Sequence, residues 1–178
     1  MARGLGLAGH GLARDGRGAV AVEFAMVVGT LVVILLNGID IAKFYFQRME
    51  LENATQMAAQ AVWKTCDTNA LPASTNCSGM TSAITTALAS TSLGNSVSQQ
   101  SGSPAEGYYC VNLSGVLTYV SSATSKPANC SSVGNASNQP GLYVRINTQY
   151  TFTPIFGSMS VGALLPTTVT SSAMMRLQ

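Results

Sequence analysis

The sequence predicts an α+β fold in which one long N-terminal helix packs on a small antiparallel sheet. Residues 19–65 contain no proline and only two glycines, so they can form a single helix. Residues 66–178 contain all four cysteines and all six prolines, with several runs rich in β-branched and aromatic residues. We therefore divide the chain into residues 1–18, a helix over 19–65 and a domain over 66–178.

The first segment is a poor candidate for folded structure. Residues 1–18 contain six glycines, which disfavour both a helix and a packed core. Three arginines oppose one aspartate, Asp15, so the segment carries a net positive charge.

The first half of the predicted helix is apolar enough to cross a membrane. The run Phe24–Ile39 is slightly short for a span of about 20 residues, and Ala19–Val22 makes it long enough. We therefore expect a membrane span from 19 to about 39. A cleaved secretory signal would need a small-x-small site after the apolar run, and the following "NGIDIAKFYF" offers none. The small residues precede the run instead, which favours a retained anchor.

Charges on either side of the span predict its orientation. The preceding segment is basic, whereas residues 40–52 carry two basic and three acidic side chains. This asymmetry places the N-terminus in the cytoplasm and the domain over 66–178 outside.

The second half of the predicted helix is amphipathic. One stripe at helical spacing comprises Phe44, Leu51, Ala54, Ala58, Ala61 and Val62. We expect this stripe to pack on the sheet of the outer domain. Asp40 with Lys43, and Arg48 with Glu52, are spaced to pair on the helix surface. Asn37 and Gly38 interrupt the apolar run, and we expect a kink or local unwinding there.

Five segments of the outer domain have the composition of regular structure, four of strands and one of a helix. We expect strands in 107–113, 115–122 and 141–156, and a closing strand in 164–177 that pairs with the one before it. Within 141–156, Leu142, Val144 and Ile146 alternate with polar or aromatic residues, which predicts one buried face. We expect a helix over Thr81–Leu93 and a loop over Gly94–Glu106.

The four cysteines allow three disulfide connectivities. We favour Cys66 with Cys77 and Cys110 with Cys130, because each pair is close in the sequence. Outside the membrane these cysteines should be oxidised. A metal site is not expected, because no C-x-x-C occurs and the only histidine, His10, lies in the first segment.

Composition argues against several classes of function. Only 9% of residues are charged and the net charge is +2, with no basic patch that would recommend nucleic acid. After His10 no histidine remains as a catalytic base, and no glycine-rich phosphate loop follows a strand. We expect neither catalysis nor a cofactor.

One acidic residue stands inside the apolar segment. Glu23 is the fifth residue after Gly18 and is followed by Phe24. A charge within a membrane span is costly, about 3 kcal/mol or more, and usually marks function. The alternative without a functional role is that the Glu23 side chain extends to the lipid headgroups on the cytoplasmic side.

The basic segment, the glycine, four small or apolar residues and the "EF" pair together resemble the processing site of type IV prepilins, closest to the tight-adherence (Flp) branch. The resemblance implies that a prepilin peptidase cuts between Gly18 and Ala19. The new ammonium at Ala19 would lie one helical turn from Glu23. In packed helices it could meet the Glu23 of a neighbour and fix the axial register, because a mismatched buried charge is costly.

Residues 37–63 resemble the segment that follows the apolar run in TadE-like proteins, with Asp40, Lys43, Leu51, Ala54 and Ala58 at matching places. The Tyr-x-Phe-x-Pro strand and the Ser/Thr strand ending at Met-Arg are also similar to that family. The resemblance implies a pilin-like fold and a structural minor pilin or pseudopilin in the inner membrane. Its partners would be a prepilin peptidase and other pilins or pseudopilins. The protein would support surface adhesion.

Two alternatives remain open at this point. One is a single-pass, membrane-anchored extracytoplasmic binding protein that is not assembled into a pilus and keeps its N-terminus. The other is a secreted binding domain, which would need a cut near Asp40 for which the sequence offers no site.

Overall fold

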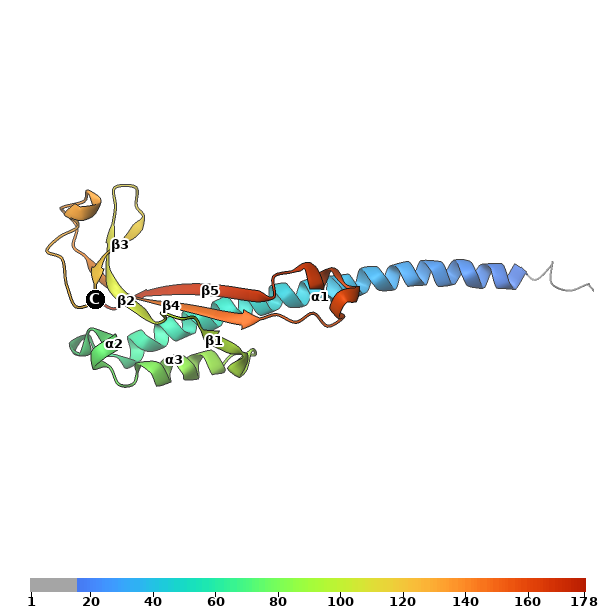
Figure 1. Ribbon diagram of the computed structural model, residues 1–178, viewed down its shortest axis with the longest axis horizontal. Coiled ribbons are helices and arrows are strands. Elements are labelled where there is room, and N and C mark those ends of the chain that lie inside the picture. Colours follow the sequence, from blue (N-terminus) through green and yellow to red (C-terminus); the bar gives the residue numbers. More distant parts are fainter. Residues whose placement is uncertain (1–15) are drawn as a thin grey trace, which may run out of the picture.

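The computed structural model describes residues 16–178, so most of the predicted leader, including His10, lies outside the described residues. Helix α1 (Gly16–Thr65) is 50 residues long. At 1.5 Å per residue it extends for about 75 Å. Its first half projects away from the rest of the molecule, and its second half lies against the sheet (Figure 1).

The expected interruption of α1 at Asn37 and Gly38 is wrong, because the helix is continuous through both residues. The Asn37 amide explains how the polar residue is accommodated. Its Nδ2 donates to the Val33 carbonyl at 2.6 Å, and its Oδ1 accepts from the Val161 amide at 2.6 Å. The side-chain amide thus shares the Val33 carbonyl with the helix's own backbone bond and also accepts from the loop, so the polar group is satisfied while the helix stays continuous.

The five strands form one antiparallel sheet. They are β1 (Val97–Gln99), β2 (Ala105–Val111), β3 (Leu117–Ser122), β4 (Gly141–Thr151) and β5 (Thr168–Arg176). Strand β4 is central: β5 pairs along it from Tyr143↔Arg176 to Thr151↔Thr168, and β1 and β2 pair with different parts of it. Strand β3 pairs with β2 alone. The predicted α+β fold is confirmed, and the arrangement of a long helix on an antiparallel sheet is pilin-like.

Two local predictions were only partly right. The helix expected over Thr81–Leu93 is α3 (Met80–Ala89), and its last turn gives way to the 3₁₀ turn η2 (Gly94–Ser96). The loop expected over Gly94–Glu106 contains β1 and the start of β2. Strand β1 has only three residues, and its pairing with distant β4 has no signal in its own short sequence.

The hydrophobic core lies between the second half of α1, the sheet and α3. The predicted helix stripe is buried, except that Ala61 is half-buried, and Ala59 and Thr55 are buried beside it. The facing residues include Ile84 and Leu88 from α3 and Val144 and Ile146 from β4. The second half of α1 is thus part of the core of the folded domain.

A pair of buried hydroxyl groups joins α1 to the central strand. Thr55 Oγ1 lies 2.6 Å from Thr148 Oγ1 and donates to the Leu51 carbonyl at 2.6 Å. Both threonines are fully buried. The contact fixes one point of α1 against β4 inside an otherwise apolar interface.

Candidate functional site: the exposed half of the long helix

The N-terminal half of α1 exposes an unusually large apolar surface. Among the described residues, one helix is long and apolar enough to cross a membrane, and its most apolar 18-residue window has mean hydropathy 2.6 and no buried residue. Exposed side chains include Phe24, Val27, Leu31 and Leu35. Soluble monomers rarely leave such a patch uncovered. The helix indicates a single membrane anchor.

The residues of the predicted processing site lie on this exposed half. Gly18, Ala19 and Glu23 are all exposed and helical. Ala19 and Glu23 are four residues apart and therefore share one face of α1. Glu23 is the only charged residue between Gly18 and Ile39, and no ion pair joins it to another side chain of residues 18–178.

The uncharged polar side chains of the same segment bond to the helix itself. Thr30 Oγ1 donates to the Met26 carbonyl at 3.0 Å, and Asn37 donates to Val33. In hydrocarbon a polar group must find its partner within the protein. Glu23 therefore differs from Thr30 and Asn37, whose side chains find hydrogen-bond partners in the backbone of their own helix.

The exposed half ends at a buried carboxylate. Asp40 is fully buried, and its oxygens accept hydrogen bonds from the backbone amides of Ile155 (2.7 Å) and Phe156 (3.4 Å) and from the Ser160 hydroxyl. The expected surface pair with Lys43 is wrong, because the loop after β4 folds over Asp40 and supplies donors that are closer. Arg48 and Glu52 do pair as predicted, at 3.3 Å.

The environment of Asp40 determines its protonation. Burial by itself raises the pKa of this carboxyl. The hydrogen bonds from Ser160, Ile155 and Phe156, with a smaller contribution from the Lys43 charge, outweigh burial and hold the pKa below its usual value. Asp40 is therefore ionised at neutral pH, and its charge keeps the loop on the helix.

Further contacts fasten the same loop on either side of Asp40. Lys43 Nζ donates to the Thr153 carbonyl at 2.9 Å and lies 5.8 Å from the Phe152 ring centroid. On the other side, Asn37 accepts from Val161. A Cβ added to Gly162 would lie 2.9 Å from the Asp40 side chain, so glycine is required for this close approach.

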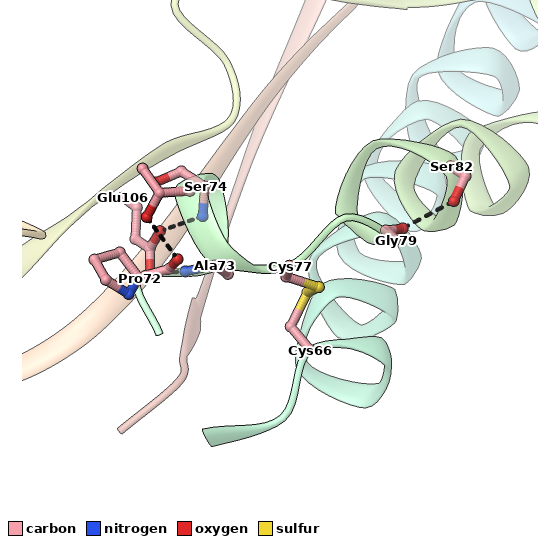
Figure 2. Close-up of a disulfide and its surroundings, with 9 residues drawn as sticks. Cys66, Pro72, Ala73, Ser74, Cys77, Gly79, Ser82 and Glu106 are labelled. Atoms are coloured by element: carbon pink, nitrogen blue, oxygen red, sulfur yellow. Dashed lines mark hydrogen bonds between the residues drawn. A yellow bond between two sulfur atoms is a disulfide. The ribbon is translucent and has the colours of Figure 1, made fainter. Parts of the chain in front are cut away.

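Two disulfides and one carboxylate hold the opposite end of the molecule. The bonded pairs are Cys66–Cys77 and Cys110–Cys130. Figure 2 shows the first of them beside Glu106 of β2, whose oxygens accept from the amides of Ala73 (2.9 Å) and Ser74 (2.8 Å) at the start of α2 (Ala73–Asn76). The Cys66–Cys77 disulfide attaches the end of α2 to the end of α1, and Glu106 attaches the start of α2 to the sheet.

The described residues contain no cluster of three potential metal ligands from His, Cys, Asp or Glu. Most charged side chains of residues 16–178 lie on α1, at intervals along its length. The exposed apolar half of α1 can anchor the domain in a membrane.

Residues 18–60 match the family model described as TadE-like protein. Over this segment the chain is similar to TadE-like proteins. The match lies within α1 and contains both Glu23 and the Asp40 junction. The family is associated with the biogenesis of tight-adherence pili, which indicates a structural, non-catalytic protein among components of that system. No curated protein and no solved structure matches the chain significantly.

Sequence reasoning missed the importance of the junction. From the sequence, Asp40 is a surface acid spaced to pair with Lys43 and a position that matches TadE-like proteins, and Gly162 carries no signal. An acid directly after an apolar run was the available signal, since it needs either water or a set of donors. Its donors come from residues 155–160, more than 110 positions away, so no local pattern could reveal them.

Proposed function

We propose that this chain is a structural minor pilin or pseudopilin that takes part in assembly of a tight-adherence pilus and supports surface adhesion. A prepilin peptidase cuts between Gly18 and Ala19, the first half of α1 then spans the inner membrane to about residue 39, and the disulfide-bonded domain lies outside. The observation that carries the proposal is the exposed apolar segment of α1 between Gly18 and Ile39, with Glu23 as its only charge, inside the segment that matches the TadE-like model.

The proposed cut creates a charged partner for Glu23. An ammonium at Ala19 of one subunit can meet the Glu23 carboxylate of a neighbouring pilin when their helices pack. In a low-dielectric surrounding, leaving one member of such a pair without the other costs about 3–5 kcal/mol. Only the register that pairs all charges is then favourable, so the pair aligns the subunits along the assembly axis.

The first experiment maps the mature N-terminus of protein from cells with an active prepilin peptidase. We expect Ala19 in the parent and uncut chain in Gly18→Phe, because a bulky ring should not fit beside the scissile bond. An N-terminus at Met1 or Ala2 in the parent would reject processing and favour the membrane-anchored binding protein that stays outside the pilus.

The second experiment tests the charge. Glu23→Ala and Glu23→Gln should insert into the membrane and be cut like the parent, yet fail to co-purify with other pilins and fail to support surface adhesion. Glu23→Asp should retain part of both. Thr30→Ala is the matched control, since it removes an uncharged polar group from the same exposed helix half. If Glu23→Ala associates and adheres like the parent, the alignment role is wrong.

A further inference from the structure

The loop that follows β4 carries a second exposed apolar surface, separate from the helix. Residues 153–167 contain no charged side chain. Four of their large apolar residues are exposed, namely Ile155 (56%), Met159 (78%), Val161 (43%) and Leu164 (86%). We call these four side chains the collar. The turns that present most of them, η4 (Gly157–Met159) and η5 (Val161–Leu164), lie beside α1 where the helix leaves the folded domain (Figure 1).

Hydrogen bonds fix the height of the collar along α1. The loop runs against the helix, so Thr153 is bound at Lys43, residues 155–160 at Asp40, and Val161 at Asn37. Side chains on a helix tilt toward its N-terminus, so Val161 lies on the membrane side of the Asn37 Cα. Val161 of the collar therefore lies about 5 Å or more beyond the Asp40 level, within the range of the apolar run, from the helical rise of 1.5 Å per residue.

That height coincides with the edge of the predicted membrane span. From Ala19 to Ile39 a helix rises about 30 Å, the thickness of the hydrocarbon core. The Asn37 level is then just inside the outer boundary of the hydrocarbon. Above it on α1, Tyr45 and Phe46 are exposed (57% and 55%), at the level where membrane proteins favour aromatic rings.

We infer that the collar is a lipid-binding surface that seats the folded domain in the outer leaflet of the same bilayer that α1 spans. This inference rests on the proposed membrane anchoring of α1, and it adds a second membrane contact from the far end of the chain. The ionised Asp40 does not face lipid, because the loop covers it completely. The carboxylate instead clamps the loop at one depth, and Ser160 and Gly162 form the surface that encloses it.

The consequence is a domain with restricted tilt and rotation. A single helix leaves the attached domain free to rotate about the membrane normal and to tilt. Apolar side chains on one side of α1 hold that side in the leaflet, with about 25 cal/mol gained for each Å² of apolar surface removed from water. The seated domain would present β5 and the disulfide-bonded end in a defined direction before assembly.

The test measures the depth of single fluorescent labels. All four native cysteines are in disulfides, so an added cysteine is the only free thiol. The processed protein carrying Leu164→Cys or Met159→Cys is labelled with nitrobenzoxadiazole and reconstituted into phosphatidylethanolamine–phosphatidylglycerol vesicles. The vesicles contain a lipid with a nitroxide either near the headgroup or near the bilayer centre. Leu31→Cys, within the span, and Leu113→Cys, 80% exposed in the β2–β3 hairpin, are the controls.

We expect the labels at 159 and 164 to be quenched by the headgroup-proximal nitroxide and to emit at shorter wavelength than the label at 113. The label at 31 should be quenched by the central nitroxide. If the label at 31 is quenched and those at 159 and 164 behave like the label at 113, lipid binding by the collar is refuted, whereas membrane anchoring by α1 is supported. If the label at 31 is not quenched either, the anchor itself fails. Cross-links from position 164 to another pilin without quenching by lipid would refute the lipid assignment.

A second variant tests the clamp. Gly162→Ala places a methyl group against Asp40 and should displace η5. Lipid quenching at 164 should then be lost while quenching at 31 is kept. Unchanged quenching at 164 would overturn the clamp as the device that sets the depth.

Discussion

The hydroxyl pair that joins α1 to the sheet predicts an unequal response to two isosteric substitutions. Thr55 has one hydroxyl hydrogen, and its Oγ1 is 2.6 Å from both the Leu51 carbonyl and Thr148 Oγ1. Because a carbonyl can only accept, Thr55 donates to Leu51 and Thr148 donates to Thr55. Thr55→Val therefore leaves the buried Thr148 hydroxyl without an acceptor, whereas Thr148→Val leaves Thr55 with its bond to Leu51.

The magnitudes follow from this direction of donation. An unsatisfied buried hydroxyl costs about 1–3 kcal/mol, and loss of one satisfied hydrogen bond costs about 0.5–1.5 kcal/mol. We expect Thr55→Val to lower the free energy of unfolding by the larger amount and Thr148→Val by the smaller. The double variant should be no less stable than Thr55→Val, because it removes the Thr148 hydroxyl that the single change leaves unpaired.

The assay is urea unfolding of the full chain in detergent micelles, followed by circular dichroism, as a double-mutant cycle. Thr170→Val, at an exposed position of β5, is the control for a threonine-to-valine change without a buried partner. Equal losses in the two single variants, summing in the double variant, would refute the assigned direction of donation.

Three further outcomes are expected. Because the pKa of Asp40 is lowered, its hydrogen bonds stabilise the fold above the ordinary pKa of about 4 and are lost as the pH falls below that value. Asp40→Asn should therefore weaken the dependence of the free energy of unfolding on acid pH. Asp67→Asn is the comparison, since the Asn69 amide also lowers the pKa of Asp67. Replacing both Cys110 and Cys130 by serine should cost about 3 kcal/mol for a closed loop of 20 residues, measured by urea unfolding. Gly162→Ala should speed proteolysis within residues 153–165, whereas unchanged digestion would show that the loop accommodates the methyl group.

The strongest sequence predictions concern segments with a sustained local pattern. The apolar run, the absence of proline and the helical stripe through Leu51 and Ala58 predicted α1 and its buried face. The alternation around Val144 predicted the central strand, and the closing strand was predicted beside it. Each depends on periodicity over many residues, where burial of one face outweighs the preferences of single residues.

The sequence by itself determined that an apolar helix with a lone acid at Glu23 precedes a disulfide-containing domain, because composition and spacing are local properties. Only the tertiary structure decided the role of Asp40, the continuity of α1 through Asn37 and the existence of β1. In each case the partners lie about 50 to more than 120 residues away, in β4 or in the loop after it. Burial of a carboxylate is tolerable only where several donors converge, and that convergence is a property of the folded chain.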